Sequence, residues 1–389
     1  MGRNDEGLSN AFIRLAESKA KNLHIHTNTS VVKVEKRDDG TFKLTLSTGD
    51  ALIVDDVISA AGVMPRVDLA REAGLALGPR DTILTDAFMR TSDPSIFAAG
   101  DVATSLDPVS GAMRPMMLAG TAAKEGRKAA DALAGFARRP RRAALQRTAS
   151  RFSARSGLRR ARASRRSSTR ARTPHKDFFP RHRHRGAITS PGTPGSVELV
   201  LKVLFDAEGR VLGAQAIGRE GADKRIDVVS TAMRFKATVH DLAELDLCYC
   251  PQTGTPKDAV NTAGHIAENI LSGLVRFIEP QELRAVMAGN APYLGEGADF
   301  SGGVTLLDVR EPAEIAEDAL PWPLLDIPLG ELRERIDEIP EGNPVVVVCR
   351  SAVRAYAAAR ALAGRRPAQP VYVLTGGMRY WHLTAPREA

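Results

Sequence analysis

The stretch PSIFAAGDVA, residues 94–103, decides the fold more than any other part of the chain. A turn over 92–94 leads into a short apolar run that ends on Gly100 and Asp101. The pattern predicts a strand with an acidic side chain at its carboxyl end. Open α/β sheets bind nucleotides there, and a carboxylate can accept hydrogen bonds from ribose or ribityl hydroxyls. The alternative interpretation is a strand–turn–helix unit with a solvated Asp101.

Secondary-structure signals surround this stretch on both sides. The spacing of apolar residues predicts one helix over 8–20 and another over 116–133. Between them, alternating apolar residues around a turn at 38–40 predict a β-hairpin, and a further strand runs into a small-residue turn at 60–62. Together these pieces indicate an α/β arrangement.

Length and composition fit a multidomain protein of ordinary hydrophobicity. A chain of 389 residues suggests about two or three domains. Hydrophobic residues make up 43% of it, and no apolar run reaches the roughly 18 residues of a membrane-spanning helix. The three cysteines are too few for a disulfide framework, so we expect a protein of the reducing cytoplasm.

Positive charge is concentrated in one segment. Residues 138–185 hold 17 arginines and one lysine against a single acid, a net charge of +17. Because the whole chain carries +8, the rest carries −9 and has an ordinary acidic balance. The range 136–190 is rich in Arg, Ala and Ser, with no apolar period, which predicts disorder.

Regular patterning returns after this segment. Residues 197–218 predict two strands joined by a turn, and amphipathic helices follow near 222–236 and 256–273. A Pro/Gly-rich joint at 280–303 precedes a last unit, 304–382, whose buried apolar strands and alanine-rich helix predict an α/β fold.

The most complete chemical constellation is VVVVCRSAVRAY, residues 345–356. A buried strand delivers Cys349 at its carboxyl end, and a helix begins within a few residues. Backbone N–H groups and the helix dipole can then point at the sulfur, and Arg350 and Arg354 add positive charge. This setting favours the thiolate and suits a persulfide carrier. A packed core cysteine that ends a strand is the alternative.

Residues 1–135 and 197–275 resemble FAD-dependent pyridine nucleotide-disulfide oxidoreductases of the coenzyme A disulfide reductase and NADH oxidase kind. The resemblance rests on GVMP at 62–65, FAAGDVA at 97–103 and DLCYCPQTGTPKDAVNTAG at 246–264. It implies partial FAD- and NAD(P)-binding Rossmann-like domains, an α+β dimerisation domain, and FAD and NAD(P)H as cofactors. Asp101 would bind the ribityl chain, and the backbone from 115 to 118 would approach the flavin ring. The cofactor-binding candidates are Gly100, Asp101, Pro115, Met116 and Met117.

The 246–264 motif also implies a subunit interface. Tyr249 stands where the family places a tyrosine that faces the disulfide site of a partner subunit, and a buried interface tyrosine is the alternative. Cys250, Gln252 and Thr253 depart from the family's usual form. We interpret Cys248 and Cys250 as buried small hydrophobes, because neither resembles the family's redox cysteine.

One family element is absent from the sequence: no G-x-G-x-x-G loop occurs to hold a pyrophosphate at a helix N-terminus. In the family these loops and the redox cysteine would fall before Met1. The resemblance therefore implies an N-terminally truncated reductase half whose activity is incomplete in this chain.

Residues 300–382 resemble a rhodanese domain. LLDVREPAE at 306–314 matches its opening strand and acidic turn, with Asp308 and Arg310 as anchors, and LTGGMRYW at 374–381 matches its closing turn. The resemblance implies that Cys349 accepts sulfur and that Arg354 closes an anion-binding loop. The family usually has Gly where Ala352 stands, and an alanine there could resist a left-handed backbone angle.

The basic segment leaves two hypotheses open. Clustered arginines can neutralise phosphates, but the sparse aromatic residues do not form stacking platforms, so nucleic-acid binding is the less favoured alternative. A sequence rich in Arg, Ala, Ser and Pro and without acidic residues is also what results when a GC-rich gene is translated in the wrong reading frame. We therefore hypothesise a frame disturbance between about residues 136 and 190.

The sequence predicts a flavin-dependent disulfide oxidoreductase of the CoA-disulfide or persulfide reductase kind with a rhodanese domain. The alternatives are a sulfurtransferase on a non-catalytic scaffold and nucleic-acid binding through 136–190. We expect a cytoplasmic homodimer, acting on a small-molecule thiol, disulfide or persulfide, without a membrane partner. The predicted segments are a half NAD(P)-binding insert (1–60), part of an FAD domain (61–135), the Arg-rich segment (136–190), a dimerisation domain (191–280), a linker (281–303) and the rhodanese domain (304–389).

Overall fold

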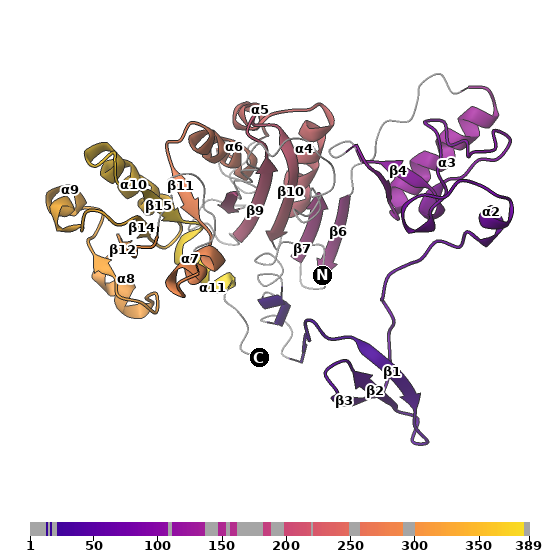
Figure 1. The fold of residues 1–389 in the computed structure, drawn as a ribbon, viewed down its shortest axis with the longest axis horizontal. Helices are drawn as coiled ribbons and strands as arrows, with labels where there is room; N and C mark the ends of the chain where they lie inside the picture. Colours follow the sequence, from indigo (N-terminus) through magenta and orange to yellow (C-terminus); the bar gives the residue numbers. More distant parts are fainter. Residues whose placement is uncertain are drawn as a thin grey trace. The chain divides into compact units, whose positions relative to one another are not determined.

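The computed structural model describes most of the chain, and its contacts divide the chain into two compact units (Figure 1). One unit is residues 15–144, and the other is residues 145–389 with 1–14. No helix among the described residues is long and apolar enough to cross a membrane. The described residues are 13–14, 16–17, 22–107, 111–136, 147–152, 156–161, 182–187, 198–218, 221–248, 257–290 and 300–384.

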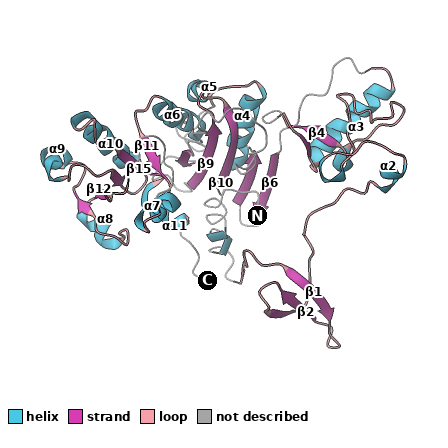
Figure 2. Cartoon of the chain, viewed as in Figure 1, coloured by secondary structure: helices cyan, strands magenta, loops and turns pink. Residues whose placement is uncertain are grey.

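The first unit opens with a three-stranded antiparallel sheet (Figure 2). Its strands are β1 (Val31–Lys36), β2 (Phe42–Leu46) and β3 (Ala51–Val54). The turn between β1 and β2 contains Gly40 at φ +87°, a left-handed angle that glycine adopts without strain. The predicted hairpin is thus confirmed. The helix predicted over 8–20 falls mostly outside the described residues, although 13–14 and 16–17 are helical.

The rest of this unit packs short elements around one small core. They are α2 (Asp68–Glu72), the 3₁₀ helices η1 (Pro79–Asp81) and η2 (Gly100–Val102), the hairpin β4 (Thr104–Leu106) and β5 (Met113–Pro115), and α3 (Ala119–Leu133). Met89 is fully buried and Ala129 of α3 packs into the same core. Helix α3 lies within the range predicted as helical, 116–133.

The strand predicted over 94–103 does not form, which corrects that interpretation. Phe97 makes a single antiparallel bridge to Arg90, and Ala103 makes a single parallel bridge to Ile83. The residues between them are extended and then turn into η2. A strand needs a continuous ladder of backbone hydrogen bonds. Isolated bridges leave this stretch as a loop that still delivers Asp101 at a turn.

The second unit contains a five-stranded antiparallel sheet in the order β6-β7-β10-β9-β8. Helix α4 packs against β7 and β10, and α6 against β8 and β9. The strands β9 and β10 and the helices α4 and α6 confirm the pattern predicted for 197–273. The elements are β6 (Arg147–Phe152), β7 (Ser156–Ala161), β8 (His182–Ala187), β9 (Glu198–Phe205), β10 (Val211–Gly218), α4 (Ala222–Arg234), α5 (Val239–Glu244) and α6 (Ala259–Leu271).

Three of these strands lie in the Arg-rich segment, so the prediction of disorder is wrong for their residues. β7 pairs with β10, and β8 pairs with β9, along continuous antiparallel registers. Strand pairing uses backbone groups that every residue except proline supplies, whereas the prediction relied on side-chain composition. The buried apolar strands β9 and β10 provide the edges on which the segment pairs.

The same unit contains a parallel sheet in the order β11-β15-β14-β12-β13. β14 carries four consecutive valines that are fully buried, and they alternate between two apolar clusters. Val345 and Val347 pack with Leu307 in one cluster, and Val346 and Val348 lie in the other. A continuous apolar run is what a parallel strand covered on both faces requires, so the predicted α/β fold is confirmed.

Helices flank this parallel sheet (Figure 1). Its elements are β11 (Arg276–Ile278), α7 (Pro280–Met287), β12 (Thr305–Asp308), α8 (Pro312–Glu317), β13 (Leu325–Asp326), α9 (Leu332–Arg335), the 3₁₀ helix η3 (Ile336–Glu338), β14 (Val345–Val348), α10 (Val353–Arg365), β15 (Val371–Leu374) and α11 (Gly377–Leu383).

The range predicted as a linker contains ordered structure. Helix α7 occupies 280–287, and Leu283 is fully buried in the cluster that also contains Trp381. The strand β11 pairs in parallel with β15, and Leu274 just before it accepts a hydrogen bond from Arg360 at 2.8 Å. These contacts tie residues 274–287 to the parallel sheet. The predicted domain boundaries as such stay a prediction.

We expect Leu283→Ala to lower the free energy of unfolding of the parallel-sheet domain by about 2–4 kcal/mol, because it leaves a cavity in a packed core. The chain's two tryptophans, Trp322 and Trp381, both touch this cluster, so their fluorescence reports its unfolding in denaturant. Val353→Ala is the control, since Val353 is 74% exposed and should change stability by less than about 0.5 kcal/mol. Equal midpoints for the two variants would contradict the placement of α7 in the core.

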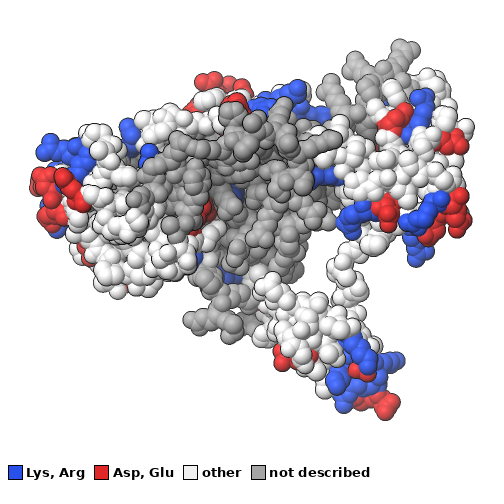
Figure 3. All heavy atoms as spheres, in the orientation of Figure 1, with Lys and Arg blue, Asp and Glu red and all other residues white. Residues whose placement is uncertain are grey.

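Charged side chains of both signs lie interspersed over the described residues on the face that Figure 3 shows. At the tip of the first sheet, for example, Arg37 pairs with Asp39 at 2.9 Å, and Lys33 pairs with Glu35 at 2.7 Å. This mixture agrees with the sequence, which concentrates the excess of positive charge between 138 and 185.

Candidate sulfur-transfer site and flavin-binding half

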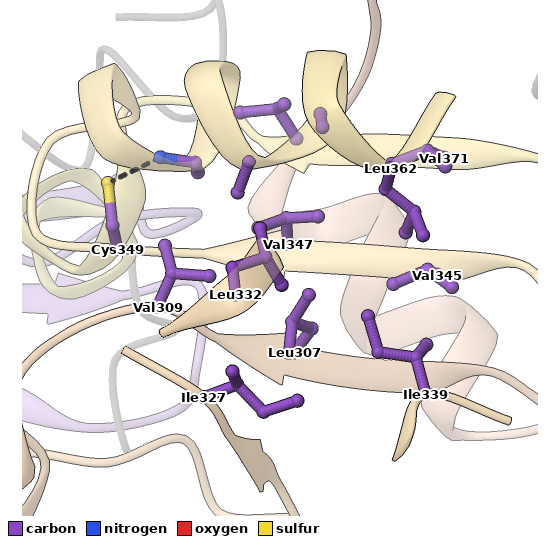
Figure 4. Packing of buried hydrophobic residues seen from close by; sticks show 14 of the residues in the cluster. Leu307, Val309, Ile327, Leu332, Ile339, Val345, Val347, Cys349, Leu362 and Val371 are labelled. Atoms are coloured by element: carbon purple, nitrogen blue, oxygen red, sulfur yellow. Dashed lines mark hydrogen bonds between the residues drawn. The ribbon is translucent and has the colours of Figure 1, made fainter. Parts of the chain in front are cut away.

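Cys349 lies directly after β14, at the N-terminal end of α10. It is only 1% exposed, and its Sγ accepts a hydrogen bond from the Ala355 N–H at 3.3 Å, as the dashed line in Figure 4 shows. The first N–H groups of a helix have no partner within the helix and carry partial positive charge. The strand therefore places a nucleophilic atom where a negative charge is stabilised.

The loop after Cys349 is held from one side by the start of α11. Met378 N–H donates to the Cys349 carbonyl at 2.9 Å, and Arg379 N–H donates to the Arg350 carbonyl at 3.1 Å. Gly377 makes this approach feasible. A Cβ on Gly377 would overlap the Cys349 carbonyl oxygen and would lie 2.8 Å from the Ser351 nitrogen. The closing glycine turn of the sequence motif thus acts by backbone contact with the reactive loop.

Arg354 lies in the first turn of α10 and not in the loop before it. Its guanidinium donates two hydrogen bonds, of 2.6 and 2.8 Å, to the carboxylate of Glu314 in α8. Hydrogen bonding to Arg354 is the largest cause that lowers the pKa of Glu314, to about 2. The pKa of Arg354 is raised, first by Glu314 and to a smaller degree by the charge of Cys349. Sequence reasoning did not identify Glu314 as a site residue.

A buried ion pair anchors the strand next to the site. Asp308 at the end of β12 is fully buried and accepts hydrogen bonds from Nε and Nη2 of Arg310, which is 2% exposed. Arg310 also donates to the carbonyls of Glu314 and Asp318. Removing one partner would leave a buried charge unpaired. The geometry agrees with the anchoring role that the sequence resemblance implies for this pair.

Arg350 adds positive charge on the outside of the loop. Its side chain is exposed, and it lies near Arg379 of α11. Burial, and secondarily the charge of Arg350, lowers the pKa of Arg379. Arg350 and Arg379 thus bring cationic side chains to the loop, and the charge of Arg354 is matched by Glu314.

Ala352 adopts a left-handed conformation, with φ +71° and ψ −10°. This is the backbone angle that the usual glycine of the resembling family suggested for this position. The β-carbon makes this region costly for alanine by roughly 1–2 kcal/mol. The loop keeps the same backbone angle without the glycine that the family usually has there, so it carries local strain.

We expect Ala352→Gly to raise the free energy of unfolding by about 1 kcal/mol, because glycine adopts the same angle without that cost. Ala361→Gly in the middle of α10 is the matched control and should lower it by a similar amount. Denaturant midpoints followed by tryptophan fluorescence check both. If Ala352→Gly lowered the free energy of unfolding as Ala361→Gly does, the strained geometry at Ala352 would be contradicted.

The candidate flavin-binding turn is fixed by a residue that sequence reasoning missed. Glu125 of α3 is fully buried, and its two carboxylate oxygens accept hydrogen bonds from the Gly100 N–H at 2.8 Å and from the Ser105 hydroxyl at 2.7 Å. Gly100 has φ +84°, and Asp101 after it is exposed. A glutamate in an amphipathic helix usually faces solvent, so the sequence alone did not indicate that Glu125 is buried and holds this turn.

The other flavin candidates lie at the end of the β4–β5 hairpin and directly after it. Pro115 pairs with Thr104 across that hairpin, and Met117 is half-buried. Met116 is only 5% exposed, so its side chain contributes to the core. Asp101 and Pro115 therefore belong to one small structure, because Thr104 lies three residues after Asp101.

The interface candidate Tyr249 and its neighbour Cys250 lie outside the described residues. Cys248 is exposed, so its interpretation as a buried hydrophobe is wrong. This thiol lies in the irregular stretch after α5, and the described residues leave it exposed.

Three protein-family models match the chain. The pyridine nucleotide-disulphide oxidoreductase model covers residues 5–126, the dimerisation-domain model of the same family covers 157–259, and the rhodanese-like domain model covers 296–384. Each falls on a region whose motifs resemble that family.

Curated relatives match parts of the chain. An NADH oxidase of Methanocaldococcus jannaschii is 28% identical over 222 residues, 56% of this chain and 47% of the relative. A coenzyme A disulfide reductase of Staphylococcus epidermidis is 46% identical over 76 residues, 19% of this chain and 17% of the relative. The chain thus spans less than half the length of these two relatives.

Two solved structures resemble nearly the whole chain. The reduced Bacillus anthracis protein CoADR-RHD superposes with a TM-score of 0.86 and 28% identity, over 99% of this chain and 64% of that one. A NAD-dependent persulfide reductase from A. fulgidus superposes with a TM-score of 0.82 and 28% identity, over 97% of this chain and 64% of that one. The chain therefore joins segments of the pyridine nucleotide-disulphide oxidoreductase family, including its dimerisation domain, to a rhodanese-like domain.

Proposed function

We propose that this chain transfers sulfane sulfur through Cys349, as the rhodanese-like part of a CoA-disulfide or persulfide reductase-like oxidoreductase. One observation carries the proposal: Cys349 Sγ lies at the N-terminal end of α10 and accepts the Ala355 N–H. Helix N-termini and nearby cations favour the thiolate, which is the reactive form of a cysteine.

The transfer step uses thiosulfate as a probe donor. The Cys349 thiolate attacks the outer sulfur, a new S–S bond forms, and the bond to the sulfonate sulfur breaks so that sulfite leaves with its electron pair. An acceptor thiolate then takes the outer sulfur and regenerates the Cys349 thiolate. The exposed Arg350 can attract an anionic donor. Because Cys349 is 1% exposed, the loop after it must open for a donor to reach the sulfur.

Intact-mass spectrometry of the full chain after incubation with thiosulfate tests this function. We expect the mass of one added sulfur atom, located on the peptide that contains Cys349 and removed by a thiol acceptor. The absence of the added sulfur, or its location on Cys248, would reject the assignment.

A reductase function is the second candidate, since two reductase structures resemble the chain. The described residues fit one end of an FAD site, where the exposed Asp101 carboxylate on a turn held by Glu125 can bind ribityl hydroxyls. FAD would supply electron transfer between NAD(P)H and a disulfide or persulfide. The sequence contains no G-x-G-x-x-G loop for the pyrophosphate, so these residues alone do not complete the site.

An absorbance spectrum of the purified full chain tests flavin binding. Flavin bands near stoichiometric occupancy would support the reductase function. A colourless protein would leave sulfur transfer at Cys349 as the chemistry of this chain.

We further propose a homodimer, supported by the match to the dimerisation-domain model, with Tyr249 at the interface and with small thiols, disulfides or persulfides as substrates in the cytoplasm. Sedimentation analysis of the purified chain tests the dimer.

The frame-disturbance hypothesis for 136–190 is a separate prediction. Reading the coding DNA in its other frames tests it. Nucleic-acid binding gains no support from the families that the chain matches.

A further inference from the structure

We propose that Glu314 is a positioning residue for the sulfur site. Through its paired hydrogen bonds to Arg354, it fixes the first turn of α10 and the Ala355 N–H that Cys349 Sγ accepts. The inference rests on the proposed sulfur transfer at Cys349, and it gives Arg354 a different role from the one that the sequence resemblance implies.

The contact is built to hold one geometry. Both Glu314 oxygens accept from Arg354, at 2.6 and 2.8 Å, and this fork arrangement fixes the direction of the guanidinium as well as its distance. The two side chains are 31% and 27% exposed, so they are more enclosed than an ordinary surface pair. Arg354 precedes Ala355 in the chain, so its position constrains the next backbone N–H directly.

Glu314 is itself held from the sheet. Its carbonyl accepts a hydrogen bond from Arg310 at 3.2 Å, and Arg310 is fixed by the buried carboxylate of Asp308. The Glu314 carboxylate also accepts the Glu311 N–H at the start of α8. A continuous series of polar contacts therefore runs from the end of β12 to the first turn of α10.

The pair also sets the net charge beside the sulfur. Because Arg354 lowers the pKa of Glu314 to about 2, the carboxylate stays ionised at every pH where a thiol titrates and offsets the Arg354 charge. The charge at Cys349 is among the causes that raise the pKa of Arg354, so these two groups interact. Removing the carboxylate would take away the strongest anionic partner of Arg354 and leave the weaker charge interaction with Glu311, so the net positive charge near Cys349 would rise.

Two effects follow for Glu314→Gln. The lost negative charge favours the thiolate, so alkylation of Cys349 by iodoacetamide should reach its half-maximal rate at a lower pH than in the unmodified chain. The amide offers one acceptor where the carboxylate offers two, so Arg354 and the Ala355 N–H lose their fixed position. Sulfur loading from thiosulfate should then slow by about tenfold, the scale of a lost hydrogen bond to a charged group.

The matched control is Glu338→Gln. Glu338 accepts two hydrogen bonds of 2.8 Å from Arg335, so the same kind of fork is broken on η3 instead of beside Cys349. We expect its pH profile and loading rate to equal those of the unmodified chain. Peptide mapping by mass spectrometry separates alkylation of Cys349 from that of the exposed Cys248.

The result that supports the proposal is slower sulfur loading together with a shifted alkylation profile, in Glu314→Gln alone. Unchanged profiles in both variants, or equal shifts in both, would overturn it. If Glu314→Gln does not fold, Glu314→Asp replaces it. That variant keeps the charge but shortens the fork, so it should keep the alkylation profile and slow sulfur loading, and unchanged loading would overturn the proposal. Alkylation needs no sulfur donor, so failure of the proposed sulfur transfer in the unmodified chain would be recognised separately.

Discussion

Replacing Cys349 by alanine is expected to abolish sulfur loading from thiosulfate, with a fall of at least about 10³-fold in rate, because no other atom of the loop can form the persulfide. The fold should survive. Alanine removes one buried atom and one hydrogen bond from the Ala355 N–H, at a cost of about 1–2 kcal/mol. The measurement is the intact mass after thiosulfate treatment, with the tryptophan unfolding transition recorded in parallel.

Cys248→Ala is the matched control for this experiment. Cys248 is exposed and lies outside the rhodanese-like domain, so its loss should leave sulfur loading unchanged. Loading that survives in Cys349→Ala but disappears in Cys248→Ala would place the nucleophile in the dimerisation domain. Loading that survives in both would mean that neither cysteine alone is required for the measured sulfur.

The sequence predicted the local structure around Cys349 well because its parts are consecutive. Four valines form a strand buried on both faces, and Cys349 follows within the same segment as the helix that stabilises it. The local pattern therefore determined the type of each element, the burial of the strand and the position of Cys349. The left-handed backbone at Ala352 was also anticipated, because the rhodanese family that this segment resembles usually has a glycine there.

Residues that act across long sequence separations were not predictable. Glu314 lies 40 residues from Arg354, and Glu125 lies 25 residues from Gly100, and each looked like an ordinary helix-surface glutamate. Only the packing of α8 beside α10, and of α3 beside the turn at Gly100, shows what these carboxylates bind. Buried carboxylates depend on tertiary partners, which a single sequence does not reveal.

The two errors in secondary structure have one physical origin. The strand predicted over 94–103 has the right apolar pattern but makes only single bridges, to Arg90 and Ile83. The range 136–190 has the wrong pattern for strands, yet it holds β6, β7 and β8. In both cases the availability of a pairing edge decided the outcome, and strand propensity is weak compared with such context.

Gly377→Ala should be the most damaging single-methyl change in the rhodanese-like domain. The added Cβ would overlap the Cys349 carbonyl oxygen and would lie 2.8 Å from both the carbonyl carbon of Arg350 and the nitrogen of Ser351. These are backbone atoms of the loop that carries the nucleophile, so no side-chain rotation relieves the contact. Alanine would also have to adopt φ +59°. We expect a loss of about 3 kcal/mol or more in unfolding free energy.

The same clash should reach the chemistry, because α11 and the reactive loop are joined by the hydrogen bond from Met378 N–H to the Cys349 carbonyl. Moving them apart displaces Cys349 from the Ala355 N–H, so sulfur loading should fall even in the molecules that remain folded. Gly364→Ala in α10 is the control: it meets no atom within 4 Å, and alanine is the better helix former by about 1 kcal/mol. A Gly377→Ala protein that unfolds at the same denaturant concentration as Gly364→Ala and loads sulfur at the same rate would show that the loop does not depend on this close backbone approach.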